Sequence, residues 1–386
     1  MNSQLLSTVL STIKVEGIKN SFAGGIWGSL IRNEITALSD IDVLCFIPTE
    51  DSYFGNFSQI QNISSSHRID ILACVNTDLL DFALVNGLNF HAVFFLREVV
   101  GESLAVNSII HTQRKLHSMN GVRAREILNV LSSYCGLASS VSYGDKRWAK
   151  FSFYGTNRWV RLIQAAQLRF PEILGQSTGQ VLVYLAERYA VNSKEVIREW
   201  KACLEARKLQ EANLLNGTNQ SIDMPHDNYW TPLASLFIQD IIPWIQCNAG
   251  VPVEILKEFS YRLLGSRLNI PSCNSICQST TNMLTAFVSK DKSILERIAV
   301  ESINDWWVCS TLAANPHTPS QVLERILFSN SKINKLTWQT IRLYVAKNPN
   351  TSTETLECIL NTPNLREQDY EAAMFNLECK KDIKMR

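Results

Sequence analysis

Residues 22–47 read FAGGIWGSLIRNEITALSDIDVLCFI, a glycine-rich opening followed by a short run that is first acidic and then apolar. Asp40 and Asp42 alternate at the start of this run, so both fall on one face of a predicted strand, because strand side chains repeat with a period of two. The apolar residues after Asp42 predict that the strand is buried. Two neighbouring carboxylates repel each other, and a bridging divalent cation removes this cost. Mg²⁺ suits the position because it binds one or two carboxylates together with substrate phosphate oxygens.

Gly28 and Ser29 lie between a strand predicted over residues 21–25 and a helix predicted to begin near Leu30. A helix N-terminus presents N–H groups without helical partners and the positive end of the helix dipole, which favours binding of a triphosphate. Glycine lets the backbone approach phosphate closely, and the Ser29 hydroxyl adds a hydrogen-bonding group. This turn is therefore a candidate phosphate-binding site.

A third acid, Asp70, stands in a second apolar run that is also predicted to be a strand. Asp40, Asp42 and Asp70 on neighbouring strands would form a three-carboxylate site for two metal ions, the arrangement used for in-line phosphoryl displacement. Each feature also has a plain structural explanation. An Asp-x-Asp pair is common at a solvated strand end, Gly-Ser is common in turns, and Asp70 alone is typical of an edge strand.

The order of these residues resembles the signature of the polymerase-beta-type nucleotidyltransferase superfamily. The matching residues are Gly28-Ser29, then Arg32 and Glu34, then Ser39-Asp40-Ile41-Asp42. The preceding Gly24-Gly25 pair also resembles the glycine pair of the CCA-adding and AbiEii-like branches. Asn33 departs from the pattern, because many members have glycine there. The resemblance covers the N-terminal part of the chain only.

This resemblance implies transfer of a nucleoside monophosphate from an NTP such as ATP to an acceptor hydroxyl, with release of pyrophosphate. It implies that Asp40 and Asp42 hold two Mg²⁺ ions, for which Mn²⁺ can substitute, and that Asp70 binds the catalytic ion nearest the acceptor. Gly28 and Ser29 would then contact the β- and γ-phosphates. Arg32 would add a positive charge nearby.

Lys150, Tyr154 and Arg158 are each four residues apart, so they share one face of a predicted helix. The segment resembles the helix that carries a Lys and an Arg toward the triphosphate in several two-domain nucleotidyltransferases. Cations at this place suit the chemistry, because negative charge develops on a transferring phosphoryl group. A solvated basic face with an aromatic-rich back explains the same pattern without any ligand.

A repeat occupies the C-terminal part of the chain. Asn315-Pro316 returns as Asn348-Pro349, and LERIL at 323–327 returns as LECIL at 356–360, each 33 residues later. A period in this range with helical patterning predicts an α-solenoid, and it resembles variant leucine-rich or HEAT-like repeats. Repeats of this kind commonly present a surface to a partner protein.

The sequence therefore predicts an α+β protein in three parts. A small mixed β-sheet nucleotidyltransferase core is expected over residues 1–105, with one of its strands over residues 91–96. An all-α domain that closes the cleft is expected over 106–275, and the α-solenoid over 280–386. With 386 residues, 46% of them hydrophobic and 19% charged, the chain is long enough for several ordinary globular domains.

Charge and cysteine content indicate which partners and which cellular compartment to expect. The net charge of +1 gives no overall basic field, so any nucleic-acid contact would need a local patch. Ten scattered cysteines, several of them in apolar segments, favour free thiols in a reducing compartment. No apolar run reaches the length of a membrane span and no basic leader precedes the first apolar residues, so no membrane contact and a cytoplasmic location are expected.

The repeats favour a macromolecular acceptor, either an RNA end such as that of tRNA or a protein side chain, since a small substrate has no need of them. Superfamily members with similar minimal cores also act as toxins or phage-defence effectors. One alternative is a nucleotide-sensing protein whose repeats dock a partner. A second alternative is a small-molecule transferase of the aminoglycoside type.

Overall fold

The computed structural model describes residues 23–32, 34, 36, 39, 41–47, 69–75, 94–101, 103–141, 154–218, 228–264, 277–329, 335–363, 365 and 367–384. The chain divides into two compact units. The first unit comprises Met1–Leu131 and Asp145–Phe237, and the second comprises Ser132–Gly144 and Ile238–Arg386. The boundary expected near residue 105 therefore falls inside the first unit, and the one expected near 275 falls inside the second.

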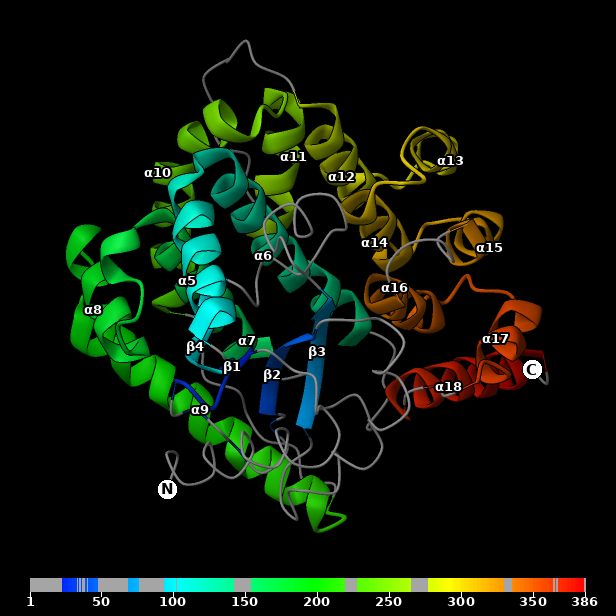
Figure 1. Ribbon diagram of the computed structural model, residues 1–386, viewed down its shortest axis with the longest axis horizontal. Helices are drawn as coiled ribbons and strands as arrows, with labels where there is room; N and C mark the ends of the chain where they lie inside the picture. Colours follow the sequence, from blue (N-terminus) through cyan, green and yellow to red (C-terminus); the bar gives the residue numbers. More distant parts are fainter. Residues whose placement is uncertain are drawn as a thin grey trace. The chain divides into compact units, whose positions relative to one another are not determined.

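The first unit contains a four-stranded mixed sheet with the order β3-β2-β1-β4. Its strands are β1 (Ala23–Trp27), β2 (Ile41–Ile47), β3 (Ile69–Val75) and β4 (Arg97–Gly101). β1 is antiparallel to both β2 and β4, whereas β2 and β3 are parallel and appear as neighbouring blue arrows in Figure 1. Together with the helices, this small mixed sheet makes the protein α+β.

Two local predictions around the sheet are wrong. Phe94 and Phe95, inside the strand expected over residues 91–96, are helical, and β4 begins only at Arg97. Phe94 and Leu96 are buried in the core, which explains the apolar pattern of this segment. Their carbonyl groups accept hydrogen bonds from the Gln113 side chain, at 3.1 and 3.2 Å. After β1, residues 29–32 form a turn and not the first turn of a helix.

The rest of the first unit is helical, and no strand follows residue 101 in the described parts of the chain. α5 packs against β4 and β1, and α7 packs against α8 and α9. Ser177 caps the N-terminus of α8 in a capping box. Its hydroxyl accepts the backbone N–H of Gln180, and the Gln180 side chain accepts the backbone N–H of Ser177. The elements are α5 (Ser103–Ser118), α6 (Asn120–Val141), α7 (Tyr154–Arg169), the short η2 (Pro171–Ile173), α8 (Thr178–Arg188) and α9 (Ser193–Leu215).

The second unit is all helical where it is described. α12, α14, α16 and α18 pack in succession, and α13, α15 and α17 alternate with them, as the yellow-to-red part of Figure 1 shows. The helices are α10 (Trp230–Ala249, which begins in the first unit), α11 (Val253–Leu264), α12 (Gln278–Val288), α13 (Lys292–Glu301), α14 (Trp306–Ala314), α15 (Ser320–Ser329), α16 (Lys335–Lys347), α17 (Thr353–Leu360) and α18 (Glu367–Lys384). No helix in the described ranges combines the length and the apolar character that a bilayer span requires.

The repeat rests on a ladder of buried asparagines. The Asn348 amide donates to the carbonyl groups of Ala313 and Asn315, both at 2.8 Å, and its Oδ1 accepts the N–H of Asn350 at 3.0 Å. Asn315 repeats this pattern one period earlier, with donors to the Ala286 and Ser289 carbonyls. Asn315 and Asn348, 33 residues apart in the sequence, thus each donate to two carbonyl groups at the C-terminal end of an earlier helix.

Asn348→Ala is expected to lower the free energy of unfolding by about 2–3 kcal/mol. The substitution removes three hydrogen bonds and leaves two buried carbonyl groups and one N–H without this partner, and each such group costs about 1 kcal/mol or more. Urea unfolding followed by circular dichroism measures the change. The matched control is Asn361→Ala at an exposed position, for which the change should stay within about 0.5 kcal/mol. Equal losses in the two variants would show that the ladder does not stabilise the repeat.

Candidate functional site

The sheet brings two of the predicted acids together. Asp42, the second residue of β2, is in register with Asp70 of the parallel strand β3. Residues in register on neighbouring strands occupy the same face of a sheet, about 4.8 Å apart. Ile41 and Val43, on either side of Asp42, are fully buried, whereas Asp42 is half-buried. Of Asp70 the structure describes the backbone, and Asp40 lies outside the described residues.

Gly28 lies directly against the carboxylate of Asp42. Trp27, the last residue of β1, is in register with Asp42, so the chain leaves β1 beside the acid. Gly28 has φ +85°, and a Cβ atom placed there would be 2.1 Å from Asp42 Oδ2. Glycine suits this position, because the left-handed backbone is costly for other residues and an added side chain would displace the carboxylate oxygen. The predicted Gly-Ser turn therefore adjoins the predicted acid.

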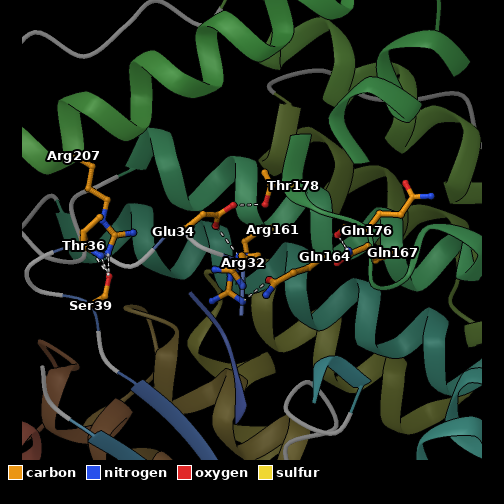
Figure 2. Close-up of polar contacts among 10 residues, drawn as sticks. All are labelled: Arg32, Glu34, Thr36, Ser39, Arg161, Gln164, Gln167, Gln176, Thr178 and Arg207. Carbon is orange, nitrogen blue, oxygen red and sulfur yellow. Dashed lines mark hydrogen bonds and ion pairs between the residues drawn. The ribbon is translucent and has the colours of Figure 1, made fainter. Parts of the chain in front are cut away.

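The loop after this turn is held by α8 through Glu34. Arg32 Nε donates to the buried Glu34 carboxylate at 2.7 Å, and the Thr178 hydroxyl donates to its other oxygen (Figure 2). Thr178 is the first residue of α8, where the positive end of the helix dipole favours a carboxylate. Arg32, expected to help bind phosphate, thus pairs with Glu34 in the same loop.

A second contact holds the end of the loop against α9. Thr36 and Ser39, both buried, form hydrogen bonds with each other, and the Thr36 hydroxyl donates to Glu211 Oε1 at 2.8 Å. Arg207, one turn earlier on α9, donates to the same Glu211 oxygen at 2.9 Å. The residue that precedes Asp40 is therefore fixed by a helix that comes much later in the sequence.

The basic helix face expected from Lys150, Tyr154 and Arg158 takes a different form. α7 begins at Tyr154, Lys150 lies outside the described residues, and the Tyr154 side chain is not described. Arg158 is only 3% exposed, and its guanidinium carbon lies 4.9 Å from the ring centroid of Trp230. This placement gives Arg158 a part in helix packing, so we do not include it among the residues that bind phosphate.

Thr178, Arg207 and Glu211 are not among the residues predicted from the sequence, although they contact the motif loop. They are separated from their partners in the loop by 144 residues or more. The capping box at Ser177 marks the start of a helix, and the i,i+4 spacing of Arg207 and Glu211 marks a helical ion pair. Neither pattern indicates what the helix contacts.

The acids that could bind a metal are only partly described. Among the described side chains, no group of three His, Cys, Asp or Glu residues is close enough to share a metal ion. Of the three acids predicted to do so, Asp42 is the one whose side chain is described. Comparisons with protein-family models, with curated proteins and with solved structures give no match.

Proposed function

We propose that the protein is a metal-dependent nucleotidyltransferase, which moves a nucleoside monophosphate from an NTP to an acceptor hydroxyl. The observation that carries the proposal is the contact between the Gly28 turn and the Asp42 carboxylate, with Asp70 in register on the next strand. Nucleotidyl transfer needs a backbone that approaches phosphate closely and carboxylates beside it. Gly28 and Asp42 lie together at one end of the two central strands, β1 and β2.

The donor set fits Mg²⁺, or Mn²⁺ in its place. Asp42 is a hard oxygen ligand, and its carboxylate lies against the Gly28 turn, which would approach the phosphate. Asp40, Asp42 and Asp70 would hold the ions. When bound, these ions would neutralise charge on the transferring phosphoryl group.

The protein's own groups then have separate tasks. The Gly28 backbone and the Ser29 hydroxyl would bind the β- and γ-phosphates, and Arg32, through its pair with Glu34, would hold the loop that follows. Asp70 would accept the proton of the acceptor hydroxyl while the hydroxyl oxygen forms its bond to the α-phosphorus of the NTP. The bond from that phosphorus to the bridging oxygen breaks, and pyrophosphate leaves with the bonding electrons.

The acceptor in this proposal is a macromolecule, either an RNA end or a protein hydroxyl. The helical repeats of the second unit support this choice, because stacked repeats offer an extended surface that a small acceptor has no need of. A toxin or phage-defence role is one setting in which such a transfer would serve.

Asp42→Asn is expected to reduce nucleotidyl transfer about 1000-fold, because charge held at the reacting phosphate is worth several kcal/mol. Purified protein is incubated with Mg²⁺, each α-³²P-labelled NTP, total RNA and cell lysate. A labelled RNA or protein band identifies both the donor and the acceptor class. Asp240→Asn, at an exposed position of α10, is the matched control and should label like the wild type.

The assay separates the competing functions. Full labelling by Asp42→Asn would overturn the proposed site. Binding of NTP without any label in the wild type would favour a nucleotide sensor that docks a partner through its repeats. Label found only in small molecules, and retained after deletion of residues 280–386, would favour a transferase of the aminoglycoside type.

A further inference from the structure

Three buried side chains and one partly buried side chain connect the loop before β2 to α9. We call them the α9 relay: Thr36, Ser39 and Glu211, with the partly buried Arg207. Figure 2 shows Arg207 reaching down from α9 toward Thr36 and Ser39. Thr36 and Ser39 are nearly inaccessible to solvent, and the Glu211 side chain is 0% exposed. The relay joins parts of the chain that are 168 residues apart at Ser39 and Arg207, and 175 apart at Thr36 and Glu211.

The direction of each hydrogen bond in the α9 relay follows from chemistry. A carboxylate only accepts, so the Thr36 hydroxyl donates to Glu211 Oε1 at 2.8 Å. The Ser39 hydroxyl must then donate to Thr36 Oγ1, 2.7 Å away. Ser39 Oγ in turn accepts the Thr36 N–H at 2.9 Å and lies 3.5 Å from Arg207 Nη2. The relay is therefore a directed chain that runs from the loop to α9.

Burying Glu211 is costly, and the sequence nevertheless places it at this point of α9. A buried carboxylate is tolerated only when it is paired and hydrogen-bonded, and Arg207 at 2.9 Å supplies the opposite charge. An apolar residue would pack in the interior at lower cost. Glu211 provides a buried acceptor for the Thr36 hydroxyl, in the loop that precedes β2.

We propose that the α9 relay positions the metal-binding carboxylates, so that Glu211 and Thr36 are positioning residues for the transfer. Ser39 directly precedes Asp40, and Asp42 follows two residues later. A relay that holds Ser39 therefore positions the start of β2, the strand that carries Asp42. The inference rests on the proposed function, but its test does not depend on transfer alone.

The loop is held at two further points, which makes the relay effective. Gly28 lies against Asp42 at its beginning, and Glu34 is bound by Thr178 of α8 in its middle. Among the described residues of this loop, the relay is the contact nearest the start of β2. Small displacements of reacting groups are known to reduce rates about 100-fold, so a loosened strand start should have a measurable effect.

The test compares three full-length variants. Thr36→Val keeps the shape of the side chain and removes the hydroxyl that bridges to Glu211. Glu211→Gln keeps an oxygen that accepts from Thr36, whereas Glu211→Ala does not. Glu205→Gln is the matched control, because Glu205 lies on the same helix, is 69% exposed and pairs with Lys208 at the surface.

The readouts are the rate constants of transfer, Mn²⁺ affinity by isothermal titration, and hydrogen–deuterium exchange of the peptide 36–47. We expect Thr36→Val to lower kcat about tenfold with KM for NTP within about twofold, and to weaken Mn²⁺ binding about tenfold, as for outer-shell partners of metal ligands. Exchange across residues 36–47 should accelerate, while exchange in α9 stays at the level of the control variant. Glu211→Gln should retain more activity than Glu211→Ala.

These outcomes separate the two proposals. No transfer by the wild type overturns the proposed function, and the exchange and Mn²⁺ data still decide the role of the relay. Unchanged exchange and unchanged Mn²⁺ affinity in Thr36→Val, or a wild type that binds no Mn²⁺, overturns the positioning role. A loss that appears only as global unfolding, with kcat and Mn²⁺ affinity normal below the melting transition, assigns the relay to stability alone.

Discussion

Gly28→Ala is expected to lower the free energy of unfolding by about 2–4 kcal/mol and to abolish nucleotidyl transfer. The backbone there has φ +85°, and the left-handed region costs an L-residue about 1–2 kcal/mol. The added Cβ would also stand 2.1 Å from Asp42 Oδ2, far inside van der Waals contact. The carboxylate or the turn must move, and either movement separates the proposed phosphate and metal sites.

Two other glycines separate the causes of this effect. Gly217 has φ +66° with nothing within 4 Å of a Cβ, so Gly217→Ala should cost only the backbone strain of about 1 kcal/mol. Gly179, in α8, has open space and no positive φ, so Gly179→Ala should stabilise by up to about 1 kcal/mol through helix propensity. Chemical unfolding and the labelling assay measure all three. If Gly28→Ala resembled Gly217→Ala in both, the close contact with Asp42 would be refuted.

Asp369→Ala is expected to destabilise the second unit by about 3–5 kcal/mol, because breaking a buried ion pair leaves an uncompensated charge. Arg342, on α16, donates to Asp369 Oδ2 of α18 from Nε at 2.9 Å and from Nη2 at 2.6 Å. The two side chains are 3% and 0% exposed. The variant would remove the carboxylate that pairs with the buried Arg342 guanidinium between α16 and α18. Thermal unfolding followed by far-ultraviolet circular dichroism measures the loss.

A surface ion pair in the same unit serves as the control for Asp369→Ala. Arg297 and Glu301 are 3.9 Å apart and are 66% and 47% exposed, so Glu301→Ala should change stability by less than about 0.5 kcal/mol. A double variant with Arg342→Met and Asp369→Leu should recover most of the loss, because apolar replacements often match a buried pair. If Asp369→Ala behaved like Glu301→Ala, the buried pair would not hold these helices together.

The repeat shows how much a sequence pattern can predict. Asn315 and Asn348 follow a 33-residue period because each closes its own turn with bonds that any copy of that turn requires. Asn376 completes the ladder by donating to the carbonyls of Ala346 and Asn348, but it lies 28 residues on and has no following proline. The sequence pattern therefore predicted two of the buried asparagines, and the packing of α18 against α16 showed the third.

Arg158 shows where a pattern is insufficient. Tyr154 and Arg158 are four residues apart in α7 and therefore share one helix face, whereas Lys150 lies outside the described residues. This spacing does not indicate what covers that face. α7 packs against both α8 and α9, and Arg158 lies over Trp230 in the interior. A face that looks solvated in the sequence is thus occupied by a neighbour that arrives later in the chain.

The sequence by itself determined the features that depend on local geometry. The alternation around Asp42 and the period of the repeat follow from bonds and dihedral angles of residues close together in the chain. Only the tertiary structure decided that Asp42 pairs in register with Asp70, and that Thr36 meets Glu211 across 175 residues. Such contacts form because separate elements bury one another's surfaces, and this process leaves no periodic signal in either segment.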